Sequence, residues 1–519
     1  MSRFYIKSIH IETVRKVCEN FQYLNMGIFV HVLSGRNDMV FSSLTFLLYF
    51  LPVTLLIYFA LSFSIKFQNI WLFIVSVVFY AWGEPLYVII LLISILINYI
   101  LGLFIDRYRK KKSSLAKLFL VLDVIFNIGV LFVFKYLGFF VGIINQVVGH
   151  ELILAPQIIL PIGISFFTFQ ALSYAVDVYR RDAEVQKNPF YMGLYIAFFP
   201  QLIAGPIVRY KTIKEYISCR KFNLNQITDG ICRFSVGLSK KVLLSNALGV
   251  VADIIYKLTE TGSALYSVSV VMAWVGAISY MLQIYYDFSA YSDMAIGLGK
   301  VFGFEFEENF NYPYISESIG EFWRRWHISL GTWFREYVYF TLGGSKLDNE
   351  DFMVRNMFVV WFFTGLWHGA SWTFILWGLY NFLFILLERL VSFEEWKNKF
   401  GLKYMYSNII VLFGWVIFRA ERLNIMREFF GNMFGVNNNT FCDSTVVMLL
   451  KEYWMIYIPA ILFVMPLAPW LRKKLMESDK TKFRVSAKAG YVLALTAGII
   501  LSFLCLVRGG YNPFIYFNF

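Results

Sequence analysis

The chain has 519 residues, of which 58% are hydrophobic and only 16% are charged, and its formal net charge is +13. Together with a mean hydropathy of +0.60, this composition excludes an ordinary soluble protein and indicates a polytopic, all-α membrane protein. Many of the basic residues form short clusters between apolar runs, as in cytoplasmic loops under the positive-inside rule, so we expect no nucleic-acid partner.

The first 38 residues differ in character from the rest of the chain. They mix charged and apolar residues and lack the pattern of a secretory signal peptide. Two interpretations stay open: an amphipathic or disordered arm, or an extension upstream of a true start at Met39. In both, residues 39–519 form one membrane domain.

Apolar runs that could enter a bilayer recur along nearly all of that domain. Two of them, 161–170 and 198–206, contain glycine, proline and polar residues, which predicts re-entrant or broken helices lining a cavity. No internal repeat is visible, which argues against an inverted-repeat transporter. The expected spans are 41–63, 69–83, 86–105, 116–134, 157–176, 191–208, 234–256, 264–300, 357–387, 405–419, 453–471 and 489–507.

Two features of the connecting segments bear on topology and cofactors. The basic cluster Arg107–Lys112 is predicted to face the cytoplasm. The five cysteines form neither a CxxC pair nor a metal-ligand spacing, so we expect no disulfide framework, no metal and no bound cofactor. They are Cys18, Cys219, Cys232, Cys442 and Cys505.

Several polar residues end the long apolar run 264–300. On a helix, Asp287 and Tyr291 share one face, and Ser289 and Asp293 share another. Ionised carboxylates at membrane depth are costly unless they are paired or hydrated. The side chains are therefore expected to form either a polar wall of a reaction chamber or a hydrogen-bonded packing seam between helices.

The segment 306–346 is less apolar and combines charges with aromatic residues, which predicts helices lying at the membrane interface. Arg324 and Arg325 in this segment are more typical of contacts with anionic lipids or phosphate than of catalysis. His327 follows them, at the expected edge of the membrane core, where it is either an active-site residue or an interface histidine.

His368 is the most informative residue of the chain. It lies in the motif Trp367-His-Gly-Ala-Ser-Trp372, inside the expected membrane segment 357–387. An ionisable ring at that depth is costly and marks a functional site by default. Because imidazole titrates near neutral pH, proton abstraction is the chemistry that it predicts.

At these residues the chain resembles the membrane-bound O-acyltransferase superfamily, and within it the branch of the bacterial alginate O-acetyltransferase membrane subunit and related polysaccharide O-acetyltransferases. The resemblance covers nearly everything after Met39. The motifs that carry it are Asp287-Phe-Ser-Ala-Tyr-Ser-Asp-Met294, Phe322-Trp-Arg-Arg-Trp-His-Ile-Ser-Leu330, Thr332-Trp-Phe-Arg335, Leu342-Gly-Gly344 and Leu366-Trp-His-Gly-Ala-Ser-Trp372.

The resemblance implies a ring of tilted and broken helices around a central tunnel, in the inner or plasma membrane of a bacterium. It also implies that His368 is the essential histidine and His327 the second active-site residue. The donor would be a cytosolic thioester such as acetyl-CoA, and the acceptor an extracytoplasmic polysaccharide, reached through a serine-dependent, esterase-like partner. Ser371, tryptophan side chains such as Trp367, or backbone N–H groups could then stabilise the oxyanion.

Two other classes of protein would show the same spans and buried charges. One is a transporter or flippase of a lipid-linked saccharide, and the other is an acyltransferase that acts on lipid, protein or teichoic acid. Release of thiol from acetyl-CoA separates the transporter from the transferases, and the identity of the acceptor separates the transferases from each other.

Overall fold

The computed structural model describes residues 39–110, 112–156, 158–221, 223–261, 268–344, 350–391, 402–476, 481–509 and 511–515. The prediction for residues 1–38 lies outside this part of the chain. Within it, the regular secondary structure is helical, apart from one isolated bridge between Phe310 and Trp326. The all-α prediction is confirmed.

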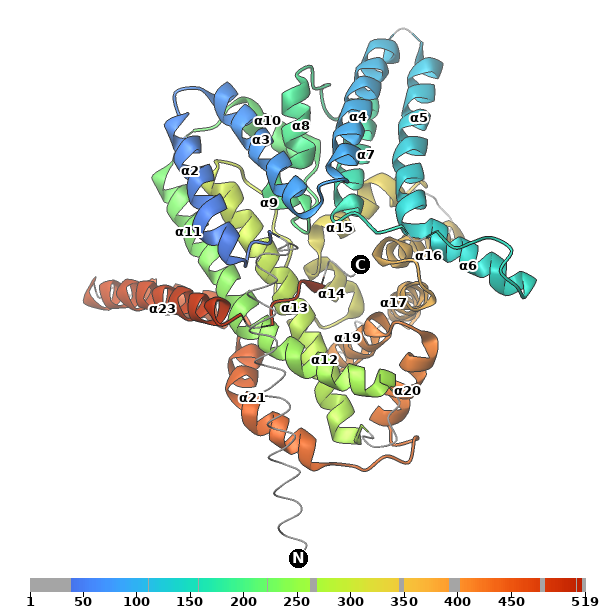
Figure 1. Ribbon diagram of the computed structural model, residues 1–519, viewed down its shortest axis with the longest axis vertical. Coiled ribbons are helices and arrows are strands. Elements are labelled where there is room, and N and C mark those ends of the chain that lie inside the picture. Colours follow the sequence, from blue (N-terminus) through green and yellow to red (C-terminus); the bar gives the residue numbers. More distant parts are fainter. Residues whose placement is uncertain are drawn as a thin grey trace, which may run out of the picture.

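The order of the helices along the chain can be followed in Figure 1. Those of the first half are η1 (Phe46–Phe50), α2 (Leu51–Ala60), α3 (Ile65–Gly83), α4 (Val88–Arg109), α5 (Ser113–Leu131), η2 (Phe132–Tyr136), α6 (Leu137–Val148), α7 (Ile164–Arg180), α8 (Pro189–Ala197), α9 (Phe199–Leu202), α10 (Tyr210–Ser218), α11 (Leu224–Ser239), η3 (Lys240–Ser245) and α12 (Asn246–Thr261).

The second half begins with the longest of these helices. Its elements are α13 (Val270–Val301), η4 (Pro313–Ile315), α14 (Ile319–Arg325), α15 (Ile328–Trp333), η5 (Phe334–Tyr339), α16 (Glu350–His368), α17 (Trp372–Leu390), α19 (Lys403–Arg419), α20 (Leu423–Met433), α21 (Ser444–Phe463), α22 (Leu467–Met476) and α23 (Thr481–Val507).

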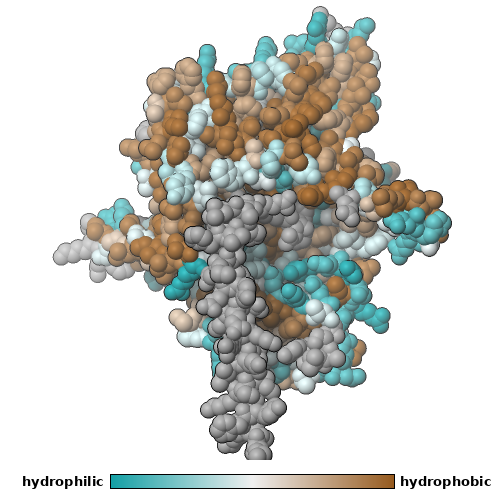
Figure 2. All heavy atoms as spheres, in the orientation of Figure 1, coloured by the Kyte–Doolittle hydropathy of each residue, from teal (hydrophilic) through white to brown (hydrophobic). Residues whose placement is uncertain are grey.

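Seven helical stretches of the described chain are long and apolar enough to cross a membrane, which confirms a multi-pass membrane protein. Apolar side chains cover the upper part of the molecule, over α2 to α5 (Figure 2). The seven stretches are Ile65–Gly83, Val88–Arg109, Ser113–Val148, Leu224–Thr261, Trp372–Leu390, Ser444–Phe463 and Arg484–Val507.

The expectation of one membrane segment over 357–387 is wrong. Two helices, α16 and α17, form a hairpin there, and His368 is the last residue of the first helix. Gly365 and Gly378 allow the two helices to approach each other closely. A Cβ on Gly378 would lie only 2.5 Å from the carbonyl oxygen of Trp361. Ser371 begins the second helix by accepting a hydrogen bond from the backbone N–H of Phe374. His368 therefore lies at a turn rather than within a span.

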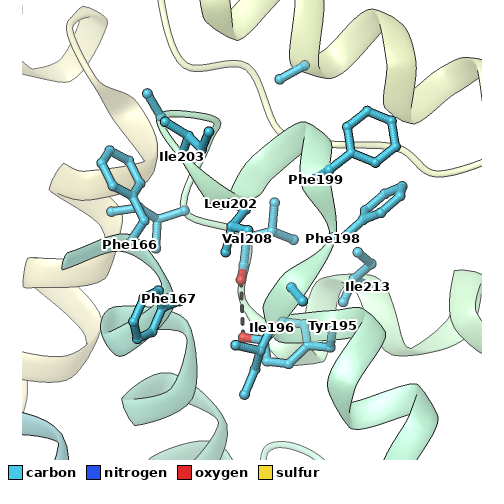
Figure 3. Close-up of a cluster of buried hydrophobic side chains, with 14 of the residues drawn as sticks. Phe166, Phe167, Tyr195, Ile196, Phe198, Phe199, Leu202, Ile203, Val208 and Ile213 are labelled. Carbon is cyan, nitrogen blue, oxygen red and sulfur yellow. Dashed lines mark hydrogen bonds between the residues drawn. The ribbon is translucent and has the colours of Figure 1, made fainter. Parts of the chain in front are cut away.

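The expectation of broken helices is confirmed for 198–206, where α8 ends at Ala197 and the four-residue α9 follows. Phe198, Phe199 and Leu202 from this break pack among buried side chains that include Phe167 of α7 (Figure 3). The irregular backbone is thus enclosed by protein, as the absence of water in a bilayer requires. In 161–170 only the beginning is irregular, because α7 is continuous from Ile164.

Two hydrophobic cores meet along α13. The residues of α13 up to Phe288 pack with α12, α19 and α20 in one core, and those from Tyr291 onward pack with α3, α7 and α8 in the other. The helix lies near the centre of the molecule (Figure 1). Side chains at the junction of the two cores are therefore shielded from both faces.

Candidate active site

His327 lies in a tight turn between α14 and α15. Its backbone is in the left-handed region, with φ 44° and ψ 53°, which costs a non-glycine residue about 1 kcal/mol or more. The backbone N–H of Ile328 donates to the carbonyl oxygen of Asn309 over 3.0 Å and holds the turn in place. The side chain is only 2% exposed. Such strain in a buried histidine is typical of a functional position.

Asn309 fixes the tautomer of His327. The amide oxygen of Asn309 accepts hydrogen bonds from the backbone N–H and the hydroxyl of Ser329, at 3.2 and 3.0 Å. His327 Nδ1 lies 3.1 Å from the same oxygen and therefore carries the proton. Nε2 is left as a basic nitrogen with no hydrogen-bond partner in the described chain. Burial also lowers the pKa of the imidazole, which keeps it neutral.

His368 is enclosed by aromatic rings from both helices of the hairpin and from α19. Its ring centroid lies 4.9 Å from that of Trp367, and 5.0 Å from those of Trp377 and Phe418. The side chain is 7% exposed, and Nδ1 is buried with no hydrogen-bond partner among the described residues. The packing fixes the ring, while Nδ1 stays without a hydrogen-bond partner among the described residues.

The ring of Trp367 lies close to the rings of both histidines. Its ring lies 5.9 Å from that of His327, and its indole N–H is a third buried polar group without a described partner. A buried polar group that lacks a hydrogen bond costs about 1–3 kcal/mol. Three such groups at one place are unusual in a folded protein and indicate atoms kept for a substrate.

A pocket opens beside His368 and Trp367. One wall is the irregular segment that leads into α7, and the others are the end of α16 and the π-helix η2. Phe166 and Ile203, which face each other in Figure 3, are part of the lining. The complete lining is Lys135, Leu160, Pro161, Ile162, Gly163, Ile164, Ser165, Phe166, Ile203, Trp367 and His368.

The carboxylates of α13 do not line this pocket and are engaged elsewhere. Asp287 pairs with Lys241, each about 1% exposed, and accepts hydrogen bonds from Ser245 and from the backbone N–H of Ile515. Asp293 pairs with Arg233 at 2.9 Å and with Lys240 at 2.7 Å. These contacts are those of a hydrogen-bonded packing seam.

The other two predicted wall residues are also buried on α13. Tyr291 stacks on Phe41 with 4.6 Å between the ring centroids and packs against Phe514. The hydroxyl of Ser289 is buried without a described hydrogen-bond partner. Neither residue lines the pocket, so a role in a reaction chamber stays a prediction.

The remaining predicted residues divide between the surface and the hairpin. Arg324 is exposed. Arg325 pairs with Glu321 at 2.8 Å and donates to the carbonyl oxygen of Asn311. Ser371 is committed to its cap and to a 2.8 Å hydrogen bond with Thr373. Trp367 is the predicted oxyanion donor that reaches both histidines.

Sequence reasoning missed Lys135 and Asn309. Lys135 follows the apolar run 116–134 directly, and a lysine in that position is a usable signal, because intramembrane charges are rare and functional. Asn309 carries no such signal, since its importance depends on the turn that brings it to His327. In the described chain, no group of three histidine, cysteine or acidic side chains is arranged to hold a metal ion.

Comparisons with known proteins identify the family of the chain. The model of the membrane-bound O-acyltransferase family matches residues 179–426, which include both histidines. A probable alginate O-acetylase of Pseudomonas putida is 37% identical, over 93% of this chain and 100% of the relative. A peptidoglycan O-acetyltransferase of Helicobacter pylori is 31% identical over 93% and 98%. A teichoic acid D-alanyltransferase of Bacillus subtilis is 28% identical over 50% and 67%.

Proposed function

Because the chain belongs to the membrane-bound O-acyltransferase family, we propose that it transfers an acetyl group from cytosolic acetyl-CoA toward the hydroxyls of an extracytoplasmic polysaccharide, with His368 as the general base. The observation that carries this proposal is the buried, uncommitted imidazole of His368 beside a pocket. We propose that the domain that performs the reaction spans residues 39–519, and the burial of Met39 and Phe41 in the core supports a beginning near Met39.

The proposed reaction uses the neutral form of both histidines. His368 removes the proton from the attacking hydroxyl while that oxygen bonds to the thioester carbonyl carbon. The carbonyl π electrons move onto its oxygen, and collapse of this intermediate breaks the C–S bond. The departing thiolate then takes the proton from His368. His327 Nε2, fixed by Asn309, can accept a hydrogen bond and so position the attacking group.

The polysaccharide acceptor is supported by the names of the relatives, which refer to alginate and to peptidoglycan. The described part of the chain consists largely of helices, and seven of its helical stretches could cross a membrane. We therefore propose that a serine-dependent, esterase-like extracytoplasmic partner receives the acetyl group and passes it to the polymer.

Purified protein in liposomes tests the proposal. Radiolabelled acetyl-CoA is supplied on one side, and the polymer is supplied on the other, with and without the partner. We expect free coenzyme A to appear in proportion to acetyl transfer, with polymer labelling only when the partner is present. Movement of a lipid-linked saccharide without thiol release would identify a flippase instead. Efficient polymer labelling by the chain alone would refute the two-component scheme and leave the transferase activity standing.

A further inference from the structure

Lys135 is a cation brought to the end of α16 by a π-helix. It lies in η2, within the apolar stretch Ser113–Val148. Its ammonium donates to the carbonyl oxygen of Trp367 over 2.5 Å and to the hydroxyl of Ser165 over 3.2 Å. π-helical turns inside longer helices occur frequently at functional sites. The lysine is thus held directly beside the residue that precedes His368.

Anchoring α16 does not by itself require a charge. The neighbouring Tyr136 already binds the end of this helix, because its hydroxyl donates to the carbonyl oxygen of Leu366 over 2.9 Å. A cation in an apolar segment is costly unless it is paired. In the described chain no carboxylate forms an ion pair with Lys135, whereas Lys241 on η3 is paired with Asp287. A cation–π contact with the ring of Trp367, whose centroid lies 5.8 Å from the ammonium, stabilises the charge without neutralising it. The presence of a net charge at this place therefore still needs an explanation.

The pocket supplies that explanation. Lys135, Ser165 and His368 line it together, and the N-terminus of the 17-residue helix α7 forms part of the same wall. An ammonium has three N–H donors, of which two are used by Trp367 and Ser165. The positive end of a helix and a cation beside an uncommitted histidine form a site suited to a negatively charged oxygen.

We propose that Lys135 binds the oxyanion that forms when the acceptor hydroxyl attacks the thioester carbonyl. The inference rests on the proposed function and identifies a catalytic group for it. As the new C–O bond forms and His368 takes the hydroxyl proton, the carbonyl π electrons move onto the oxygen held by Lys135. When the carbonyl re-forms, the C–S bond breaks and the thiolate takes the proton from His368. Ser371, a donor expected from the sequence, is instead committed to capping α17.

The test compares two substitutions that each remove one hydrogen bond to the end of α16. Lys135→Met also removes the charge and the hydrogen bond to Ser165, whereas Tyr136→Phe leaves both in place. We expect Lys135→Met to lower kcat by about 10²–10³-fold, the usual loss for one oxyanion donor, with the KM for acetyl-CoA nearly unchanged, because the oxyanion exists only in the transition state. Tyr136→Phe is expected to lower kcat less than about 3-fold, and Lys135→Arg to recover part of the loss.

The outcomes distinguish this inference from the function on which it rests. Equal losses of kcat in Lys135→Met and Tyr136→Phe would mean that Lys135 only anchors the helix, and would overturn the proposal. A fully active Lys135→Met protein beside an inactive His368→Gln protein would overturn it too, while leaving the transferase mechanism intact. If Lys135→Met does not fold, Lys135→Gln replaces it, because the amide keeps a donor for the Trp367 carbonyl without the charge.

Discussion

Two sets of buried polar side chains in this protein have opposite surroundings. On α13, Asp287 and Asp293 are each engaged by cationic side chains, and both oxygens of each carboxylate accept a hydrogen bond. At the junction with the hairpin, His327, Trp367 and His368 each keep a buried nitrogen without a described partner. Both sets are buried polar groups, but only the second leaves atoms available for a substrate. The first set thus has the contacts of a structural seam, and the second set is the one that we propose for the chemistry.

The largest effect expected from this comparison is the loss of activity in His368→Gln. Glutamine keeps the size and some hydrogen bonding but cannot accept the proton, so polymer O-acetylation in cells should fall by about 10²–10⁴-fold, the usual contribution of a general base. Membrane abundance, measured by immunoblot, should stay normal because the substitution removes no described hydrogen bond. A normally expressed variant with full O-acetylation would refute the assignment of His368 as base.

Lys241→Met should show the opposite pattern. It leaves Asp287 buried without its cation, which costs about 3–5 kcal/mol for a broken buried pair. We expect a clearly lower midpoint of thermal unfolding in detergent, while kcat per folded molecule changes less than about 3-fold. Adding Asp287→Leu should recover much of the stability, because no charge is then left unpaired. A large loss of kcat at unchanged stability would show that the seam takes part in the reaction.

Asn309→Ala should have an intermediate effect on the rate. Without the amide oxygen, His327 is free to place its proton on either nitrogen, so kcat should fall by about 10- to 100-fold, as for other residues that orient an active-site histidine. Asn309→Asp keeps an acceptor for Nδ1–H and should lose less activity. A merely structural role of Asn309 predicts equal rates per folded molecule for both variants.

The smallest effect concerns Glu336 of η5. This residue belongs to neither of the two sets of buried side chains, so its variant serves as a reference for the size of the other effects. Burial raises the pKa of this carboxyl, but hydrogen bonds from Lys211 and Arg209 outweigh it and lower the pKa below its ordinary value of 4.5. A lowered folded-state pKa stabilises the protein above the unfolded pKa, and this stabilisation is lost as pH falls through the folded value. Glu336→Gln should cost about 1 kcal/mol or less at pH 7.

The control for Glu336→Gln is the pH dependence of its unfolding midpoint. The difference in unfolding midpoint between the native protein and Glu336→Gln should shrink as pH falls below about 4.5, because the carboxyl of the unfolded chain binds a proton first. The difference should be lost once the pH has fallen through the lower pKa of the folded state. A difference that is constant from pH 7 to pH 3.5 would show that the ion pairs with Arg209 and Lys211 contribute nothing measurable.

Much of the fold could be predicted from composition and apolar runs, because hydrophobicity in a membrane protein reports span positions directly. The hairpin of α16 and α17 could not be predicted in this way. Its turn at 369–371 consists of small residues that do not interrupt the hydropathy, and the close contact of Gly365 with Gly378 is a tertiary feature. Both histidines could be identified because polar rings in apolar surroundings are rare.

The surroundings of those histidines could not be predicted in the same way. Asn309 reaches His327 through a turn with positive φ at a non-glycine residue, which no sequence pattern indicated. The pairing of Asp287 with Lys241 joins residues 46 positions apart on different helices, so sequence left its role open between a chamber wall and a packing seam. A functional role is distinguished from a structural one here by whether each polar atom has a hydrogen-bond partner. Those partners depend on tertiary packing, which the sequence does not show.

The most direct test of the account is the rate of acceptor-dependent coenzyme A release per folded molecule, measured side by side for His368→Gln and Lys241→Met in liposomes. The account predicts that the first variant loses about 10²–10⁴-fold in rate while keeping its unfolding midpoint, and that the second keeps its rate within about 3-fold while its midpoint falls. The reverse pattern, an active His368→Gln protein beside a stable but inactive Lys241→Met protein, would contradict it.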